Sequence, residues 1–292
     1  MRVIAESELI INSDGSIFHL HMRPEQLAGN VILVGDPGRV AMVAAHFDSV
    51  ECEGSSREFN FKTGTYRGVR FTVLSTGIGT DNIDIVVNEL DALVNIDFKT
   101  RQVKEGLTSL NILRIGTCGA VQPDIPLGSY IFSHISVGAD GLMNWYAGRD
   151  EVTIPEMEKA FVEQVGYDRN LGRPYFIKAD QKLIDAFADC SVKGMTVAAQ
   201  GFYGPQGRYV RIPLAMPDML EKFAAFSHDG YRITNFEMEG SAVAALSRKL
   251  GHRAGTICLV VANRYHKGVN PDYKELMNKL VVTALDRLAA LK

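Results

Sequence analysis

Short apolar runs rich in β-branched residues alternate along the chain with glycine-rich turns and with segments of helical periodicity. The runs span residues 31–35, 71–75, 110–116, 129–137, 195–199 and 256–262. Because these runs lack polar alternation, they predict strands that are covered on both faces. Apolar side chains recur at helical spacing in residues 80–94, 241–250 and 272–291. Strands that alternate with helices predict an α/β fold with a mostly parallel or mixed sheet.

The turns after the predicted strands are where a ligand site is expected, because ligands of α/β proteins gather at strand ends. These turns read GDPGR (35–39), STGIGTDN (75–82), GTCGA (116–120) and NFEMEG (235–240). No linker divides the chain, so we expect one domain over residues 1–292. Residues 96–111 are polar and basic, and we interpret them as a surface insertion in that domain.

Composition and charge narrow the class of protein. A formal net charge of -3 gives no electrostatic reason to expect nucleic acid or an anionic membrane as partner. The cysteines are widely spaced, which supports neither a zinc ribbon nor a disulfide scaffold. Glu6 and Glu8 interrupt any apolar leader segment, and no apolar run is long enough to cross a bilayer. We therefore expect a cytoplasmic protein.

Arg114 interrupts the apolar run at 110–116 and calls for a partner, because a guanidinium is rarely buried alone. A carboxylate is one candidate partner, and an anionic ligand such as phosphate is the other. Thr117 offers a hydroxyl beside it. Arg39 begins the helix after GDPGR, where Gly35 allows close backbone approach, and could form a second arm of an anion site. A plain strand-to-helix turn with a solvated arginine is the alternative there.

Two further segments carry candidate chemistry. Glu237 and Glu239 share one face of a strand, with Met238 on the other, and can accept hydrogen bonds from sugar hydroxyls or cap the following helix. In residues 201–210, Gln206 and Arg208 form an exposed amide and guanidinium that match a nucleobase edge, and Phe202 could stack on a base. An ordinary loop is the alternative for this segment.

Other signatures are absent or weak. The sequence has no dinucleotide fingerprint, no phosphate loop of the GxxxxGK type and no GxSxG motif. His19 and His21 have no companion ligands, so no metal site is predicted. We interpret Cys118 as a packing residue.

Taken in order, the motifs resemble the uridine and purine nucleoside phosphorylase superfamily, and within it the uridine-specific members most closely. The matching stretches are SIFHL (16–20), GDPGRV (35–40), SSREF (55–59), STGIG (75–79), RIGTCGAVQPDIPLGS (114–129), FYGPQGRY (202–209), FEMEGSA (236–242) and VVANR (260–264). The resemblance implies a central mixed sheet, distorted and barrel-like, flanked by helices.

The resemblance also implies the site residues. Phosphate would be bound by Gly35, Arg39, Arg114 and Thr117, with Arg57 from a neighbouring subunit. Ribose would be bound by Glu237, Met238 and Glu239, with His19 from the neighbouring subunit at its 5'-hydroxyl. The base would be bound by Phe202, Gln206 and Arg208. A homodimer is then the smallest active unit. No cofactor is implied, since inorganic phosphate is a co-substrate. Asn82 replaces a serine that completes a potassium site with Glu58 and Ile78 in some relatives, which argues against that ion.

The implied activity is reversible phosphorolysis of uridine to uracil and ribose 1-phosphate. Purine-specific members are expected to carry an aspartate after the last buried strand, where this chain has Ala262, Asn263 and Arg264. A purine or broad-specificity phosphorylase, a nucleosidase that uses water, and a silent nucleoside-binding protein are the alternatives. Three arginines for phosphate argue against the nucleosidase.

Overall fold

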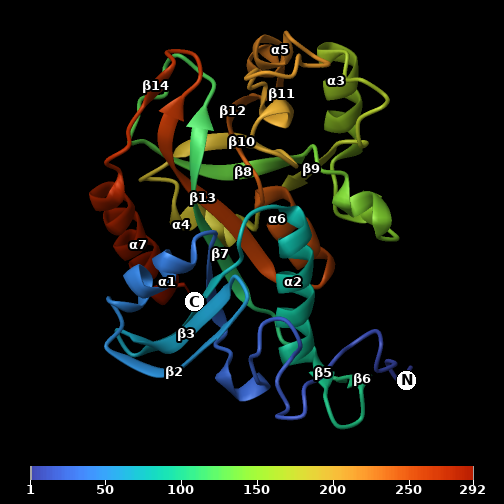
Figure 1. The fold of residues 1–292 in the computed structure, drawn as a ribbon, viewed down its shortest axis with the longest axis vertical. Helices are drawn as coiled ribbons and strands as arrows, with labels where there is room; N and C mark the ends of the chain where they lie inside the picture. Colours follow the sequence, from blue (N-terminus) through green and yellow to red (C-terminus); the bar gives the residue numbers. More distant parts are fainter. Residues whose placement is uncertain (1, 292) are drawn as a thin grey trace.

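A computed structural model describes residues 2–291, and its centre is a mixed sheet that curls on itself (Figure 1). The strands are β1 Asn30–Val34, β2 Ser49–Ser56, β3 Phe59–Tyr66, β4 Val69–Ser75, β5 Ile96–Asp97, β6 Gln102–Val103, β7 Asn111–Ala120, β8 Tyr130–Gly138, β9 Tyr175–Lys178, β10 Val192–Ala198, β11 Ser227–His228, β12 Tyr231–Glu237, β13 Arg253–Asn263 and β14 Gly268–Val269. The main sheet runs β11-β12-β10-β8-β13-β7-β1-β4-β3-β2.

One extra pairing closes part of this sheet into a barrel. The end of β12 pairs antiparallel with the end of β7, matching Phe236 with Gly119 and Asn235 with Ala120. Strand β7 also runs parallel to β1 and β13, while β8 and β13 are antiparallel. The prediction of an α/β domain with a mixed, barrel-like sheet is confirmed.

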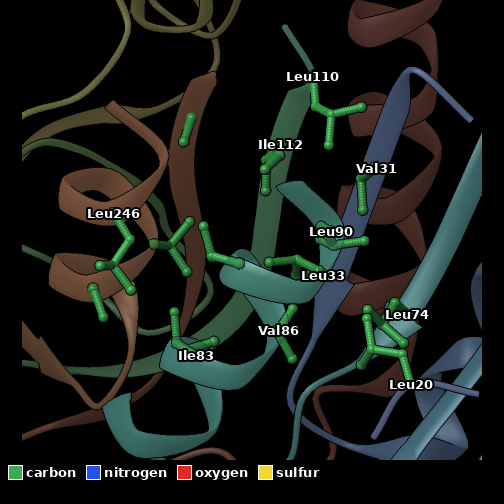
Figure 2. Close-up of a cluster of buried hydrophobic side chains, with 14 of the residues drawn as sticks. Leu20, Val31, Leu33, Leu74, Ile83, Val86, Leu90, Leu110, Ile112 and Leu246 are labelled. Carbon is green, nitrogen blue, oxygen red and sulfur yellow. The ribbon is translucent and has the colours of Figure 1, made fainter. Parts of the chain in front are cut away.

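Helices cover the sheet on both faces. They are α1 Pro37–Ala44, α2 Thr80–Asn95, α3 Pro155–Val165, α4 Gln181–Ala186, α5 Met219–Ala225, α6 Gly240–Lys249 and α7 Lys274–Ala289, with 3-10 turns at Pro24–Gln26, Leu142–Trp145, Arg149–Glu151 and Gly204–Gln206. Helices α2 and α6 pack on one face, where Ile83, Val86 and Leu90 meet Leu33 and Leu246 (Figure 2). Helices α1, α4 and α7 cover the other face, and α3 and α5 cover β8, β10 and β12.

The predicted strands and helices all occur within a few residues of their expected bounds, but the predicted turn at residues 116–120 is wrong. Strand β7 continues to Ala120, because β13 pairs alongside it and matches Cys118 with Val260. The glycines of this stretch therefore serve a strand. A Cβ added to Gly116 would lie 2.4 Å from Nη1 of Arg114, so the missing side chain leaves room for the guanidinium.

The basic segment 96–111 forms the small β5–β6 hairpin at the edge of the molecule (Figure 1). Residues 103–109 are exposed. Arg101 donates to the carbonyl of Ile4 at 2.8 Å, so the hairpin holds the N-terminal segment in place. Of the helices in residues 2–291, none is both long and apolar enough to cross a membrane.

Candidate active site

A cavity of about 800 Å³ opens where β1, β7, β12 and β13 end, and it gathers residues from distant parts of the chain. Every site residue implied by the resemblance lines it, except Arg57 and His19. The residues that line the cavity are Gly35, Arg39, Arg114, Thr117, Phe202, Gln206, Arg208, Glu237, Met238 and Glu239. The parallel strands β1 and β7 and the turn into α6 bring the anion-binding and acidic candidates to one wall.

Arg114 lies at the centre of that wall, bonded to two buried carboxylates. Its Nη1 is 3.0 Å from Oε2 of Glu237, and its Nη2 bonds Oε2 of Glu239. Burial alone would lower the pKa of Arg114, but Glu239 and Glu237 raise it, so the guanidinium stays charged. The carboxylate partner considered from the sequence is therefore present, and the same arginine also borders the cavity. Its Nε is buried without a hydrogen-bond acceptor.

The two glutamates are fixed by backbone donors. Glu237 accepts from the amides of Glu239 and Gly240 at 2.9 Å, so the helix-capping alternative is realised at this residue. Oε1 of Glu239 accepts from the Gly79 amide at 2.8 Å. Burial raises the pKa of Glu237 to about 7; Arg114 opposes this rise and Glu239 adds to it. The wall thus combines one fixed cation with two carboxylate acceptors, and the charge of Glu237 depends on pH.

The base loop, residues 201–210, closes another side of the cavity. Nη1 of Arg208 donates to the carbonyl of Phe202 and to Oε1 of Gln206, both at 2.6 Å, and the guanidinium lies 3.7 Å from the Phe202 ring centroid. Gln206 was predicted to be exposed, but it is 3% exposed because it turns under Arg208. Burial lowers the pKa of Arg208 to about 10, and the charge of Arg264 contributes.

Arg264 is a functional candidate that the sequence analysis did not assign. It donates to the carbonyls of Gln206 at 2.9 Å and Gly207 at 3.3 Å, so it ties the base loop to the end of β13. Its place at the end of the VVANR stretch was the available signal. A second, apolar cavity of about 610 Å³ lies behind the loop and shares Arg208 as a wall.

Arg57 and His19 lie outside the cavity but near each other. Arg57 is 5.9 Å from the ring centroid of Phe18, and the rings of Phe18 and His19 are 4.8 Å apart. We call Phe18, His19 and Arg57 the Phe18 patch. Arg57 is exposed, at the turn between β2 and β3, with a left-handed φ of 56°. The two residues assigned to a neighbour's site therefore share one surface.

The remaining candidates have plain packing roles or border the cavity. Cys118 is buried, and burial together with Cys258 raises the pKa of its thiol, so it stays neutral and packs in the wall as expected. The residues compared with a potassium site, Glu58, Ile78 and Asn82, all line the cavity. Over residues 2–291, His, Cys, Asp and Glu form no cluster that could hold a metal ion.

Comparison with known proteins defines the class. A Trypanosoma brucei nucleoside phosphorylase, whose crystal structure was described as showing uridine phosphorylase activity, shares the fold with a TM-score of 0.86 and 31% identity, covering 97% of this chain and 99% of that chain. The model of the phosphorylase superfamily matches residues 30–291. The chain therefore belongs to the phosphorylase superfamily and is an enzyme of the nucleoside phosphorylase family.

Two curated relatives differ in the base they are named for. A uridine phosphorylase of Thermococcus kodakarensis is 29% identical over 259 residues, which are 86% of this chain and 79% of the relative. A guanosine phosphorylase of Halorubrum lacusprofundi is 27% identical over 248 residues, 84% and 83% of the two chains. The choice of base must be argued from this chain's own residues.

Proposed function

We propose that the enzyme catalyses the reversible phosphorolysis of uridine to uracil and ribose 1-phosphate. The observation that carries this proposal is the Gln206 and Arg208 pair, which faces the same cavity as Arg39 and Arg114. An amide and a guanidinium can donate to a pyrimidine that leaves as an anion. At the end of β13, Asn263 is buried and donates to the carbonyls of Gln122 and Ile125, so this turn offers no acid to protonate a purine ring.

Phosphate would enter between Arg39 and Arg114. Arg39 lies in the first turn of α1, whose N-terminal dipole also favours an anion. Arg114 borders the same cavity and stays charged, so a phosphate oxygen there would meet a second fixed cation. A phosphate oxygen then attacks C1' of the ribose. The bond from C1' to N1 of uracil breaks, and its electron pair leaves with the base, which takes up a proton afterwards.

The transition state carries positive, oxocarbenium-like charge on the ribose. The phosphate supplies negative charge beside it. Glu239 and Glu237 retain acceptor capacity beyond Arg114 and the backbone amides, because an ionised carboxylate offers about four lone-pair sites. They would orient the ribose hydroxyls, with Met238 packed against the sugar. Nothing in this scheme requires a cofactor, because inorganic phosphate is consumed as a co-substrate.

A homodimer with shared sites is part of the proposal. His19 and Arg57 share the Phe18 patch outside the cavity, which supports their acting in the site of a second copy. The free state of the four cysteines supports a cytoplasmic location. A purine or broad-specificity phosphorylase and a nucleosidase are the alternatives that the experiment must separate.

The test measures base release from uridine, thymidine, inosine and guanosine, each with and without phosphate. We expect fast release of uracil that requires phosphate, with the purine nucleosides left intact. An Arg39→Met variant should raise the KM for phosphate about tenfold or more, as expected for loss of a charge-assisted contact. Release without phosphate would instead indicate a nucleosidase, and a preference for inosine or guanosine would overturn the assignment of the base loop.

A further inference from the structure

One carboxylate outside the cavity holds the segment that carries His19. Glu89, on helix α2, accepts from the backbone amides of His19 at 3.2 Å and Leu20 at 3.0 Å. Its Oε1 is also 2.6 Å from Nδ1 of the His19 ring. The Glu89 side chain is 12% exposed and that of His19 29%, so the pair lies at the edge of the core with the imidazole reaching outward.

Both partners of this contact are anchored. Helix α2 buries Ile83, Val86 and Leu90 in the core, and Leu20 packs into the same cluster (Figure 2). The carboxylate and the backbone of the His19 segment are therefore held by the same core. Because the two backbone amides fix the position of the carboxylate, only those His19 rotamers that bring Nδ1 to Oε1 keep the ring contact.

The contact also decides which ring nitrogen is free. An ionised carboxylate only accepts hydrogen bonds, so Nδ1 of His19 must carry a hydrogen. In the neutral imidazole, Nε2 is then the acceptor, and no hydrogen bond within residues 2–291 engages it. The ring thus presents one defined atom to whatever lies outside this subunit.

We propose that Glu89 is a positioning residue, which fixes the tautomer and direction of His19 so that Nε2 receives the 5'-hydroxyl of the nucleoside bound in the neighbouring subunit. This inference rests on the proposed function, which assigns His19 to the 5'-hydroxyl. Under this proposal Glu89 does not touch the substrate, and its effect on the reaction depends on the 5'-hydroxyl of the nucleoside.

The test compares uridine with 5'-deoxyuridine, which lacks that hydroxyl, in the full-length enzyme. Glu89→Gln keeps the shape, but its amide can face Nδ1 with a donor and so reverse the tautomer. We expect kcat/KM for uridine to fall up to about tenfold, the upper end of what one hydrogen bond between neutral groups contributes, and to change less than about twofold for 5'-deoxyuridine. His19→Ala should give the same pattern, and the double variant should add nothing to it.

Asp84→Asn is the matched control. Asp84 is on the same helix and bonds the hydroxyl of Tyr146, away from His19. This variant should leave the ratio of the two substrates unchanged. An equal loss for both substrates in Glu89→Gln would overturn the positioning role and indicate a purely structural one.

A readout independent of activity separates this inference from the proposed function. In ¹⁵N-histidine-labelled enzyme, the His19 resonances should report hydrogen on Nδ1 in the wild type and its transfer to Nε2 in Glu89→Gln. Hydrogen on Nε2 in the wild type would overturn the inference even if uridine is the substrate. If His19 has the expected tautomer but the enzyme prefers inosine, only the proposed base would be overturned. The substrate comparison would then use inosine and 5'-deoxyinosine.

Discussion

The two halves of the cavity are built differently. Arg114, Glu237 and Glu239 form the strand-end cluster, which is nearly fully buried and fixed by ion pairs and backbone amides. The base loop has no sheet partner, and Phe202 is 50% exposed. It is fixed by Arg208 from within and by Arg264 from the end of β13. In the first half the charges are part of the core; in the second they hold a surface segment in place.

This difference separates the effects expected of substitutions. A buried charge cluster couples activity to folding, because removal of one partner leaves the others without compensation. A loop held by a few hydrogen bonds couples activity to local order, with little effect on global stability. The reaction step common to every nucleoside phosphorylase would use the rigid half, and the base, which varies among relatives, would be read by the adaptable half.

The largest effect is expected from Arg114→Met. This change leaves two carboxylates buried without their cation, and should lower the free energy of unfolding by about 3–5 kcal/mol at pH 8. Urea denaturation followed by circular dichroism measures it. Arg39→Met is the control, because that side chain forms no ion pair with any residue in 2–291 and should change stability by about 0.5 kcal/mol or less. Equal stability of the two variants would mean that the cluster does not couple charge to folding.

A smaller effect is expected from pH. The pKa of Glu237 is raised from 4.5 to about 7 in the folded protein, so between those values the folded state retains a proton that the unfolded state releases. The contribution of Glu237 to the free energy of unfolding should therefore fall as pH rises from about 4.5 to about 7 and then level off.

Urea midpoints of wild type and Glu237→Gln, measured from pH 5 to pH 8, isolate this contribution as their difference. The wild type should lose stability relative to the variant across the window. A difference that is flat or that rises with pH would show that Arg114 and the amides of Glu239 and Gly240 outweigh burial at this carboxylate.

The same contrast between buried strands and exposed or loop segments explains which regions could be predicted from the sequence. The buried strands were predictable because their apolar runs are continuous. Strand β2 was missed because it is exposed and polar along much of its length, and β3 because polar residues interrupt its apolar ones. The end of β7 was misjudged because Gly116 and Gly119 are typical of turns, whereas here both lie in a strand and Gly116 makes room for Arg114. Residue types predicted the chemistry of the site, but partners more than 50 residues away, such as Arg264 and Gln206, depend on tertiary contact.

The smallest effect is expected from loss of the hydrogen bonds by which Arg264 holds the base loop. Arg264→Met removes the donors to the carbonyls of Gln206 and Gly207 without removing any group proposed to touch the substrate. Since about 1 kcal/mol or less of local order is lost, the KM for uridine should rise up to about fivefold, with kcat and the urea midpoint almost unchanged.

Arg211→Met is the matched control for that variant. Arg211 is exposed in the segment after the base loop, so its loss should leave both kinetic constants at the wild-type values. If Arg264→Met instead lowered the urea midpoint as much as Arg114→Met does, the loop would be part of the folded core, and the division of the cavity into a rigid and an adaptable half would be wrong. If neither kinetic constant changed, Arg208 alone would suffice to hold Gln206, because its bonds to Gln206 and Phe202 lie entirely within the loop.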